Sequence, residues 1–189
     1  MSSSVSAAAA ADLISSRRTI HDFKPEPVPA KELILRAVDL ARWAPNHRLT
    51  EPWRFYLLGR ETAEAIARLN AELVTKEKGE KAGRAKLARW MGMPGWMVVT
   101  CARSDDPIRS REDYAACACG IQNLALYLWS EGIGVKWTTG EVTRTDDFYD
   151  LIWVDPYAET VVGLVWYGYA REIPRASRKP VEEILVELP

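Results

Sequence analysis

The sequence predicts one layered domain of the α+β or α/β class. Short apolar runs rich in branched and aromatic residues alternate with longer stretches in which apolar residues recur every three or four positions. Few of these runs are joined by a tight hairpin signal, so strands and helices follow one another along the chain. With 189 residues, 48% of them hydrophobic, the chain is long enough to bury a substantial core.

The first quarter of the chain should contain two helices. Residues 1–11 are small and weakly apolar and lack the charged start of a signal peptide, so we expect a disordered lead with a helix-prone end. A first helix is predicted over residues 8–16. Prolines then hold residues 25–29 extended, because each proline fixes its own φ and restricts the preceding residue. A second helix should start near Ala30 and end before Pro45.

The middle of the chain begins with a strand and becomes strongly charged. Residues 53–58 are dense in aromatic and branched side chains and end at a glycine, which indicates a buried strand. An amphipathic helix is predicted over residues 61–74. Residues 75–90 carry many lysines and arginines and few apolar side chains, so we expect them to be helical or mobile, and solvated. Residues 91–95 cannot continue a regular element.

The second half of the chain alternates strands and helices. A polar loop at residues 105–111 leads into a helix at residues 112–130 that is apolar around most of its circumference, so it must be surrounded, either centrally or at a subunit interface. A short helix is expected at residues 146–152, and residues 181–188 form either a helix start or an added strand. Three further strands are predicted where branched and aromatic residues cluster, at residues 96–101, 133–137 and 160–169.

The composition narrows the classes of partner. The formal net charge is −1, so no overall basic field attracts nucleic acid or an anionic membrane. The longest apolar region, residues 114–129, is interrupted by polar residues and is too short to span a bilayer. The three cysteines have neither a metal-ligand spacing nor an even disulfide framework. We therefore expect no metal site, buried free thiols and a reducing cytoplasm.

Two polar islands carry the candidate chemistry. The first, residues 16–23, packs Arg17, Arg18, Thr19 and His21 into one short stretch. Guanidinium groups offer planar sets of donors that fit phosphate oxygens, and a hydroxyl adds a donor of different reach. The second island, residues 43–53, contains the other histidine of the chain. An arginine pair alone is also compatible with a solvated basic turn, so the second island is what favours a ligand site.

Together these islands resemble the FMN-dependent nitroreductase family, particularly its short bacterial members. There an Arg-Arg-Ser/Thr segment ends in Phe and is followed by an Ala-Pro segment that closes in Gln-Pro-Trp; this chain has Glu51 in place of the glutamine. Residues 134–140 look like the family's strand beside the flavin ring, and residues 174–184 look like its basic C-terminal motif. The resemblance covers roughly residues 12–185, with four motifs in family order.

The resemblance implies a fold that periodicity alone does not specify. It is a three-layer α/β/α sandwich of the α+β class, with a central, mainly antiparallel sheet flanked by helices. The family architecture implies a single FMN-binding domain over residues 12–189. It also implies a homodimer with FMN at the subunit interface.

The resemblance further implies which residues hold the cofactor. Arg17, Arg18 and Thr19 would reach the phosphate, the ribityl chain and the pyrimidine edge, with His21 beside them. Arg178 matches the C-terminal phosphate arginine. The candidate ring-side residues are Trp137, Thr138 and Thr139 from the strand-to-loop segment, and His47, which family members supply from the second subunit. A loop or capping role for His47 is the alternative.

The implied activity is reduction of nitroaromatics, quinones or similar electrophiles with NAD(P)H, by a ping-pong mechanism on FMN. No catalytic side chain is required, because the cofactor carries the chemistry. The sequence has no Gly-x-Gly-x-x-Gly fingerprint, so the nicotinamide would be a transient visitor. One alternative is a flavin storage or sensing protein without turnover. Another is an anion-binding interaction domain that contacts a nucleotide or a phosphoprotein.

Overall fold

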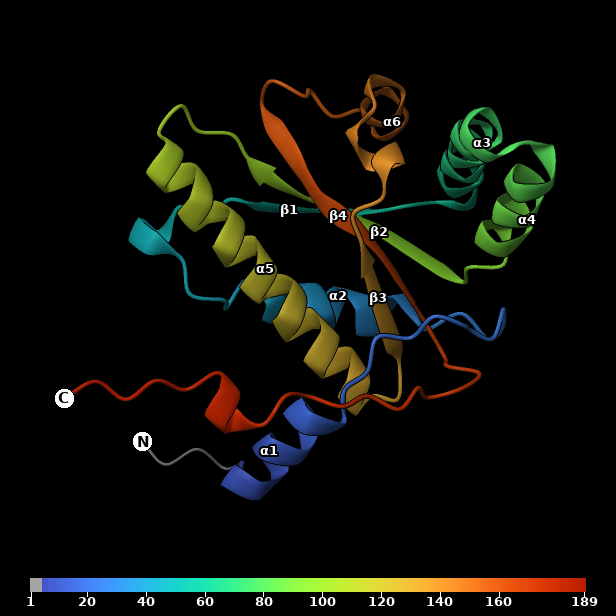
Figure 1. Cartoon of the computed structure of the whole chain (residues 1–189). Coiled ribbons are helices and arrows are strands. Elements are labelled where there is room, and N and C mark those ends of the chain that lie inside the picture. The colour runs from blue at the N-terminus through green and yellow to red at the C-terminus, as the bar shows by residue number, and fades with distance from the viewer. Residues whose placement is uncertain (1–4) are drawn as a thin grey trace.

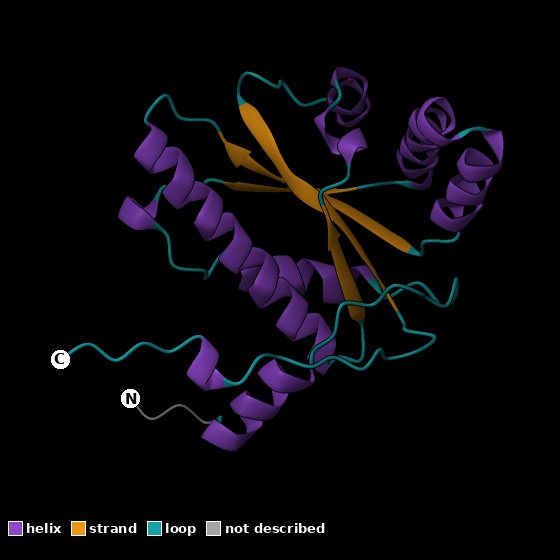
Figure 2. Ribbon diagram, in the orientation of Figure 1, coloured by secondary structure: helices purple, strands orange, loops and turns teal. Residues whose placement is uncertain are grey.

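A four-stranded antiparallel sheet organises the computed structural model, which describes residues 5–189. Its strands run in the order β1-β2-β4-β3 (Figures 1 and 2). Every neighbouring pair is antiparallel, and one register shift interrupts the β2–β4 pairing between Val99 and Thr100. The strand bounds are β1 (Trp53–Leu57), β2 (Gly95–Ala102), β3 (Gly134–Thr138) and β4 (Glu159–Gly168).

Helices cover both faces of this sheet. The α-helices are α1 (Ala7–Ser16), α2 (Lys31–Ala41), α3 (Arg60–Lys78), α4 (Glu80–Met91), α5 (Pro107–Ser130) and α6 (Asp146–Ile152). Three short 3-10 segments are η1 (His47–Leu49), η2 (Glu141–Arg144) and η3 (Val181–Glu183). On one face α2 and α5 bury residues such as Val165, and on the other α3, α4 and α6 bury residues such as Leu164. The expected α+β sandwich with an antiparallel sheet is confirmed.

The segment that follows α1 pairs with the β3 edge of the sheet and with the residues just after β4. Thr19 forms a parallel bridge to Val135, and the Ile20 N–H donates to the Val135 carbonyl at 3.1 Å. Phe23 bridges Ala170 just after β4. A Cβ at Gly134 would lie 2.3 Å from Ile20 Cγ1, so only glycine lets the two segments approach this closely. The first polar island is therefore fixed against β3.

The structure corrects the start of one predicted helix and decides between two alternatives for a second region. Helix α5 begins at Pro107, inside the expected loop, because the Asp106 side chain accepts from the Ile108 N–H and caps it. Of the two alternatives for residues 75–90, the helical one is confirmed: these residues complete α3 and form most of α4, and the chain turns back at Gly79, with φ of 83°. Helix α4 is tied to the core by Trp90, whose ring meets two other tryptophans edge to face.

The N-terminal lead and the C-terminal tail also have defined features. Of the lead that we expected to be disordered, residues 1–4 lie outside the described residues, and the chain is helical from Ala7. The tail after residue 171 runs past α1 and contains η3, so residues 181–183 begin a helical turn and add no strand. Among residues 5–189, no helix combines the length and the apolar content needed to cross a bilayer.

Candidate functional site

Arg17 and Arg178, from the two ends of the chain, lie close enough to influence each other. Burial lowers the pKa of Arg17 below its usual value, and the nearby charges of Arg178 and Arg18 lower it further. The Arg17 Nε is shielded from solvent and has no hydrogen-bond partner in residues 5–189. Two cations held together around an unused donor need an anion, which is what a phosphate would supply.

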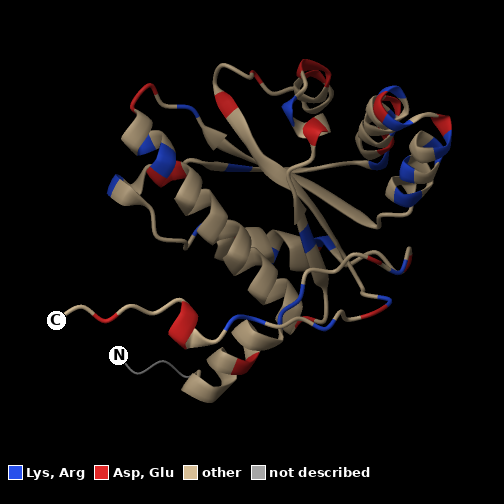
Figure 3. Ribbon diagram, viewed as in Figure 1, with Lys and Arg blue, Asp and Glu red and all other residues tan. Residues whose placement is uncertain are grey.

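The Arg18 guanidinium donates hydrogen bonds to backbone carbonyls. Its Nη1 donates to the Ser15 carbonyl at 2.6 Å and to the Arg17 carbonyl at 3.0 Å, at the end of α1. It therefore satisfies a helix C-terminus and adds positive charge beside Arg17. Figure 3 shows the basic residues of the segment after α1 beside those of the C-terminal tail, at the lower end of α5.

The strand-to-loop segment predicted beside the ring forms the end of β3. Trp137 is 36% exposed, and its Nε1 donates to the Val162 carbonyl at 3.1 Å. A Cβ at Gly163 would lie 2.0 Å from that nitrogen, so the indole packs directly on the neighbouring strand. Thr138 is half-buried at the strand end, and Thr139 is exposed in the loop that follows. Because side chains alternate along the strand, Trp137 packs on the face of the sheet that carries Val162, and Thr138 lies on the opposite face with Lys136.

A group of basic side chains lies near Thr138. Burial lowers the pKa of Lys136, and the charges of Arg89 and Lys86 lower it further. The pKa of His21 is also lowered, first by burial and then by Lys136 and Arg89. The Arg89 guanidinium donates to the His21 carbonyl at 3.4 Å. We call His21, Lys86, Arg89 and Lys136 the basic cluster.

Three residues of the basic cluster, Lys86, Arg89 and Lys136, line a cavity of about 260 Å³ between α3, α4 and the end of β3. Two donors at this cavity, Asn70 Nδ2 and Trp166 Nε1, are buried without a hydrogen-bond partner in the described chain. Glu77 and Glu141 line the cavity too, but within residues 5–189 no member of the basic cluster is in an ion pair. Unpaired donors and unneutralised cations together fit an acceptor-rich, anionic ring edge such as that of a flavin.

His47 is not brought to this site within one chain. It is exposed in η1, whose loop is anchored where Thr50 Oγ1 donates to Asp113 Oδ1 at 2.6 Å. Helix α1 is held instead near the far end of α5, where Trp129 Nε1 donates to Ser16. Residues 113 and 129 are about 24 Å apart along the helix. Figure 1 shows η1 and α1 at opposite ends of α5, so His47 and Arg17 lie far apart within one chain.

Sequence reasoning missed most of the basic cluster. Lys86 and Arg89 lie in the charge-rich stretch that we expected to be solvated. Lys136 lies inside the motif of residues 134–140, in which only residues 137–139 were assigned to the ring. The available signal was the i, i+3 spacing of Lys86 and Arg89, next to Trp90 at the end of a helix. That spacing does not show which surface the helix faces.

The chain matches a known protein family. The model of the family described as "Nitroreductase family" matches residues 14–169. The chain belongs to the nitroreductase family. The matched range contains the first island, the basic cluster and the end of β3, while Arg178 lies beyond it.

Individual relatives agree with this assignment. The Bacillus subtilis protein YfhC, an NAD(P)H nitroreductase by name, is 31% identical over 182 residues, covering 94% of this chain and 93% of its own. A nitroreductase-like family protein from Bacillus cereus superposes with a TM-score of 0.84 and 29% identity, covering 100% of this chain and 98% of its own. A nitroreductase with bound FMN from Desulfitobacterium hafniense has the same fold, with a TM-score of 0.72, 19% identity, and coverage of 95% and 97%.

Proposed function

We propose that this chain is an FMN-dependent oxidoreductase that uses NAD(P)H to reduce nitroaromatic, quinone or similar electrophilic small molecules. The observation that carries the proposal is the unpartnered Arg17 Nε beside Arg178, in a chain of the nitroreductase family. Bound FMN would supply the redox chemistry, taking hydride from the nicotinamide and passing reducing equivalents to the acceptor in a ping-pong sequence. The protein's task is to bind, orient and charge-stabilise.

Each part of the site has a proposed role toward FMN. Arg17 and Arg178 hold the phosphate, while Arg18 and Thr19 stand beside the ribityl chain. The basic cluster takes the pyrimidine edge, where cations stabilise negative charge that builds up on reduction. Trp137, Thr138 and Thr139 would pass along the ring at the end of β3. These assignments fit the donors that lack partners in the described chain.

We also propose a homodimer with FMN at the subunit interface. The separation of His47 from Arg17 along α5 supports it, because a second subunit is needed to bring both islands to one cofactor. The tail supports it too: Ile184, Val186 and Leu188 are 72%, 78% and 85% exposed, apolar surface that a partner would cover. The free, mostly buried cysteines agree with a cytoplasmic location.

The decisive experiment uses the colour of the cofactor. The purified protein should be yellow and should release one FMN per chain on denaturation. Anaerobic addition of NADH or NADPH should bleach the flavin absorbance, and a nitroaromatic or quinone should restore it. A yellow protein that neither nicotinamide bleaches would instead be a flavin storage or sensing protein. A colourless protein that does not take up FMN would leave only an anion-binding interaction domain.

A further inference from the structure

A larger cavity lies apart from the proposed flavin site. It measures about 500 Å³ and opens where the segment of residues 25–31 meets the end of β1, the start of α3 and the end of α4. This volume falls within the range of about 300–1,000 Å³ that small-molecule sites occupy. Nothing in the proposed oxidoreductase reaction uses this space.

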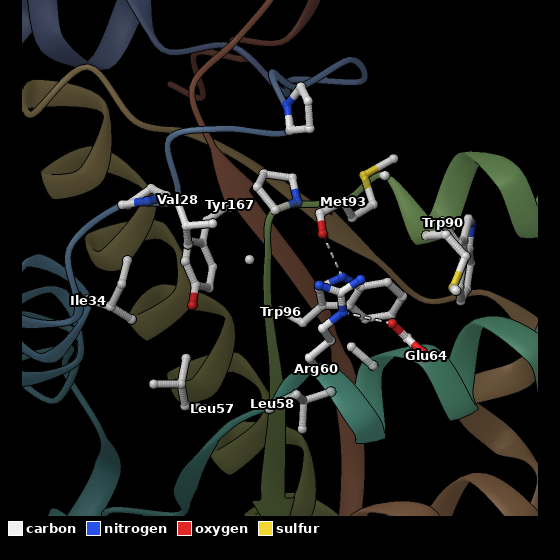
Figure 4. A pocket seen from close by; sticks show the side chains of 18 of the residues that line it. Val28, Ile34, Leu57, Leu58, Arg60, Glu64, Trp90, Met93, Trp96 and Tyr167 are labelled. Atoms are coloured by element: carbon white, nitrogen blue, oxygen red, sulfur yellow. Dashed lines mark hydrogen bonds and ion pairs between the residues drawn. The ribbon is translucent and has the colours of Figure 1, made fainter.

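The walls of the cavity are aromatic and aliphatic. Figure 4 shows Val28, Ile34 and Tyr167 on one side and Trp90, Trp96 and Met93 on the other. Aromatic rings attract a flat ring through edge and offset contacts worth about 0.5–1.5 kcal/mol each, and a thioether adds sulfur contacts of similar size. Three prolines also line the cavity, at positions 25, 29 and 94, and limit its collapse.

One polar group of the wall lacks a partner. Tyr167 is 5% exposed as a whole residue, and its hydroxyl has no hydrogen-bond partner within residues 5–189 but is reached by solvent at the cavity. Burial raises the pKa of Tyr167 to about 12, so the hydroxyl is uncharged at neutral pH and remains a donor. The hydroxyl is therefore available to donate a hydrogen bond to a ligand oxygen that replaces water in the cavity.

The charges around the cavity cancel. Glu26 and Glu64 face Lys31 and Arg60 among the lining residues. Arg60 Nε pairs with Glu64 Oε1 at 2.8 Å, and the Arg60 side chain is 92% exposed, so its charge stays in water. An apolar cavity without net charge does not repay the desolvation of an ionic ligand. The lining therefore favours a neutral molecule.

We propose that this cavity binds a neutral, flat aromatic molecule carrying one oxygen acceptor, such as a phenol or an aryl ketone. The ring lies between the two walls, and the oxygen accepts from the Tyr167 hydroxyl. Trp90 lines both this cavity and the cavity of the basic cluster, so one indole separates the two sites. The proposal does not depend on the oxidoreductase function.

Equilibrium dialysis of the full-length purified protein with 2-naphthol tests the proposal. We expect saturable binding of one 2-naphthol per chain. Tyr167→Phe should weaken binding roughly three- to tenfold, because one hydrogen bond is lost, without lowering thermal stability, because the hydroxyl has no protein partner within residues 5–189. Val28→Trp should fill the cavity and weaken binding more. Leu35→Trp changes a side chain of similar exposure outside the cavity and should have no effect.

Two further measurements separate this site from the flavin site. Binding of 2-naphthol should persist in Arg17→Ala protein that has lost its FMN, and excess FMN should not displace it. The anionic 2-naphthoate should bind at least tenfold more weakly than 2-naphthol. The proposal is overturned by absence of saturable binding, by equal affinity in the wild type, Tyr167→Phe and Val28→Trp, or by displacement with FMN.

Discussion

Replacing Arg17 with methionine separates a cofactor role from a structural role. Methionine keeps an unbranched stem but removes the guanidinium, whose Nε lacks a partner and which Arg178 repels. A buried unpaired polar group costs about 1–3 kcal/mol. The side chain is only partly buried, so the flavin-free protein should become more stable by at most about 1 kcal/mol. A hydrogen bond to a charged group contributes about 1.5–3 kcal/mol, so FMN should bind roughly 10- to 150-fold more weakly.

The two effects have opposite signs and need two assays. Urea denaturation of the flavin-free protein gives the free energy of unfolding, and quenching of flavin fluorescence gives the FMN dissociation constant. Arg18→Met is the matched control: its guanidinium donates to two backbone carbonyls, so its loss should lower stability by about 0.5–1.5 kcal/mol. The reasoning is refuted if Arg17→Met destabilises the flavin-free protein by 1 kcal/mol or more and leaves FMN affinity unchanged.

Three further outcomes follow from the site. Arg89→Met should lower the two-electron midpoint potential of bound FMN by about 30 mV or more, measured by dye equilibration, whereas Arg84→Met should not. The flavin-free protein should lose stability as pH falls just below 6.5, because the unfolded chain protonates His21 more readily than the folded chain does. Bound FMN should reverse the lowering of the His21 pKa, so FMN binding should be accompanied by proton uptake. Calorimetry in buffers of different ionisation enthalpy detects this uptake. Gly163→Ala should displace Trp137 and cost about 1–3 kcal/mol in denaturant unfolding; wild-type stability would contradict this packing.

Strand positions could be predicted because local composition is sufficient to identify them. Strands β2 and β4 are continuous runs of branched and aromatic residues bounded by breakers, as sheets covered on both faces require. The start of α5 was harder. Asp106 and Pro107 are loop formers in general, yet at a helix start they are a cap and a first-turn residue. Asp106 and Pro107 can stand in a loop or at a helix start, and the packing of the residues that follow determines which of the two forms.

The residues of the candidate site could be predicted only in part, because some of them are adjacent in the sequence and others meet only in the fold. Arg17 to His21 are adjacent in the sequence, so their clustering needs no knowledge of the fold. Lys136 meets Arg89 only because β3 pairs with β4 and α4 packs on the same face over Trp166. That convergence depends on the sheet order, which one sequence does not contain. The resemblance to the family supplied the sheet architecture but did not single out these two cations.

Pairing of Thr19 with Val135 has a consequence for self-association. Without the segment before Phe23, β3 would present a row of free amide and carbonyl groups, which is a template for another strand. Trimming the chain up to that point should therefore yield protein that aggregates, even before any cofactor is considered. The segment that contains Arg17 and Arg18 therefore also protects the edge strand β3 from pairing with another chain.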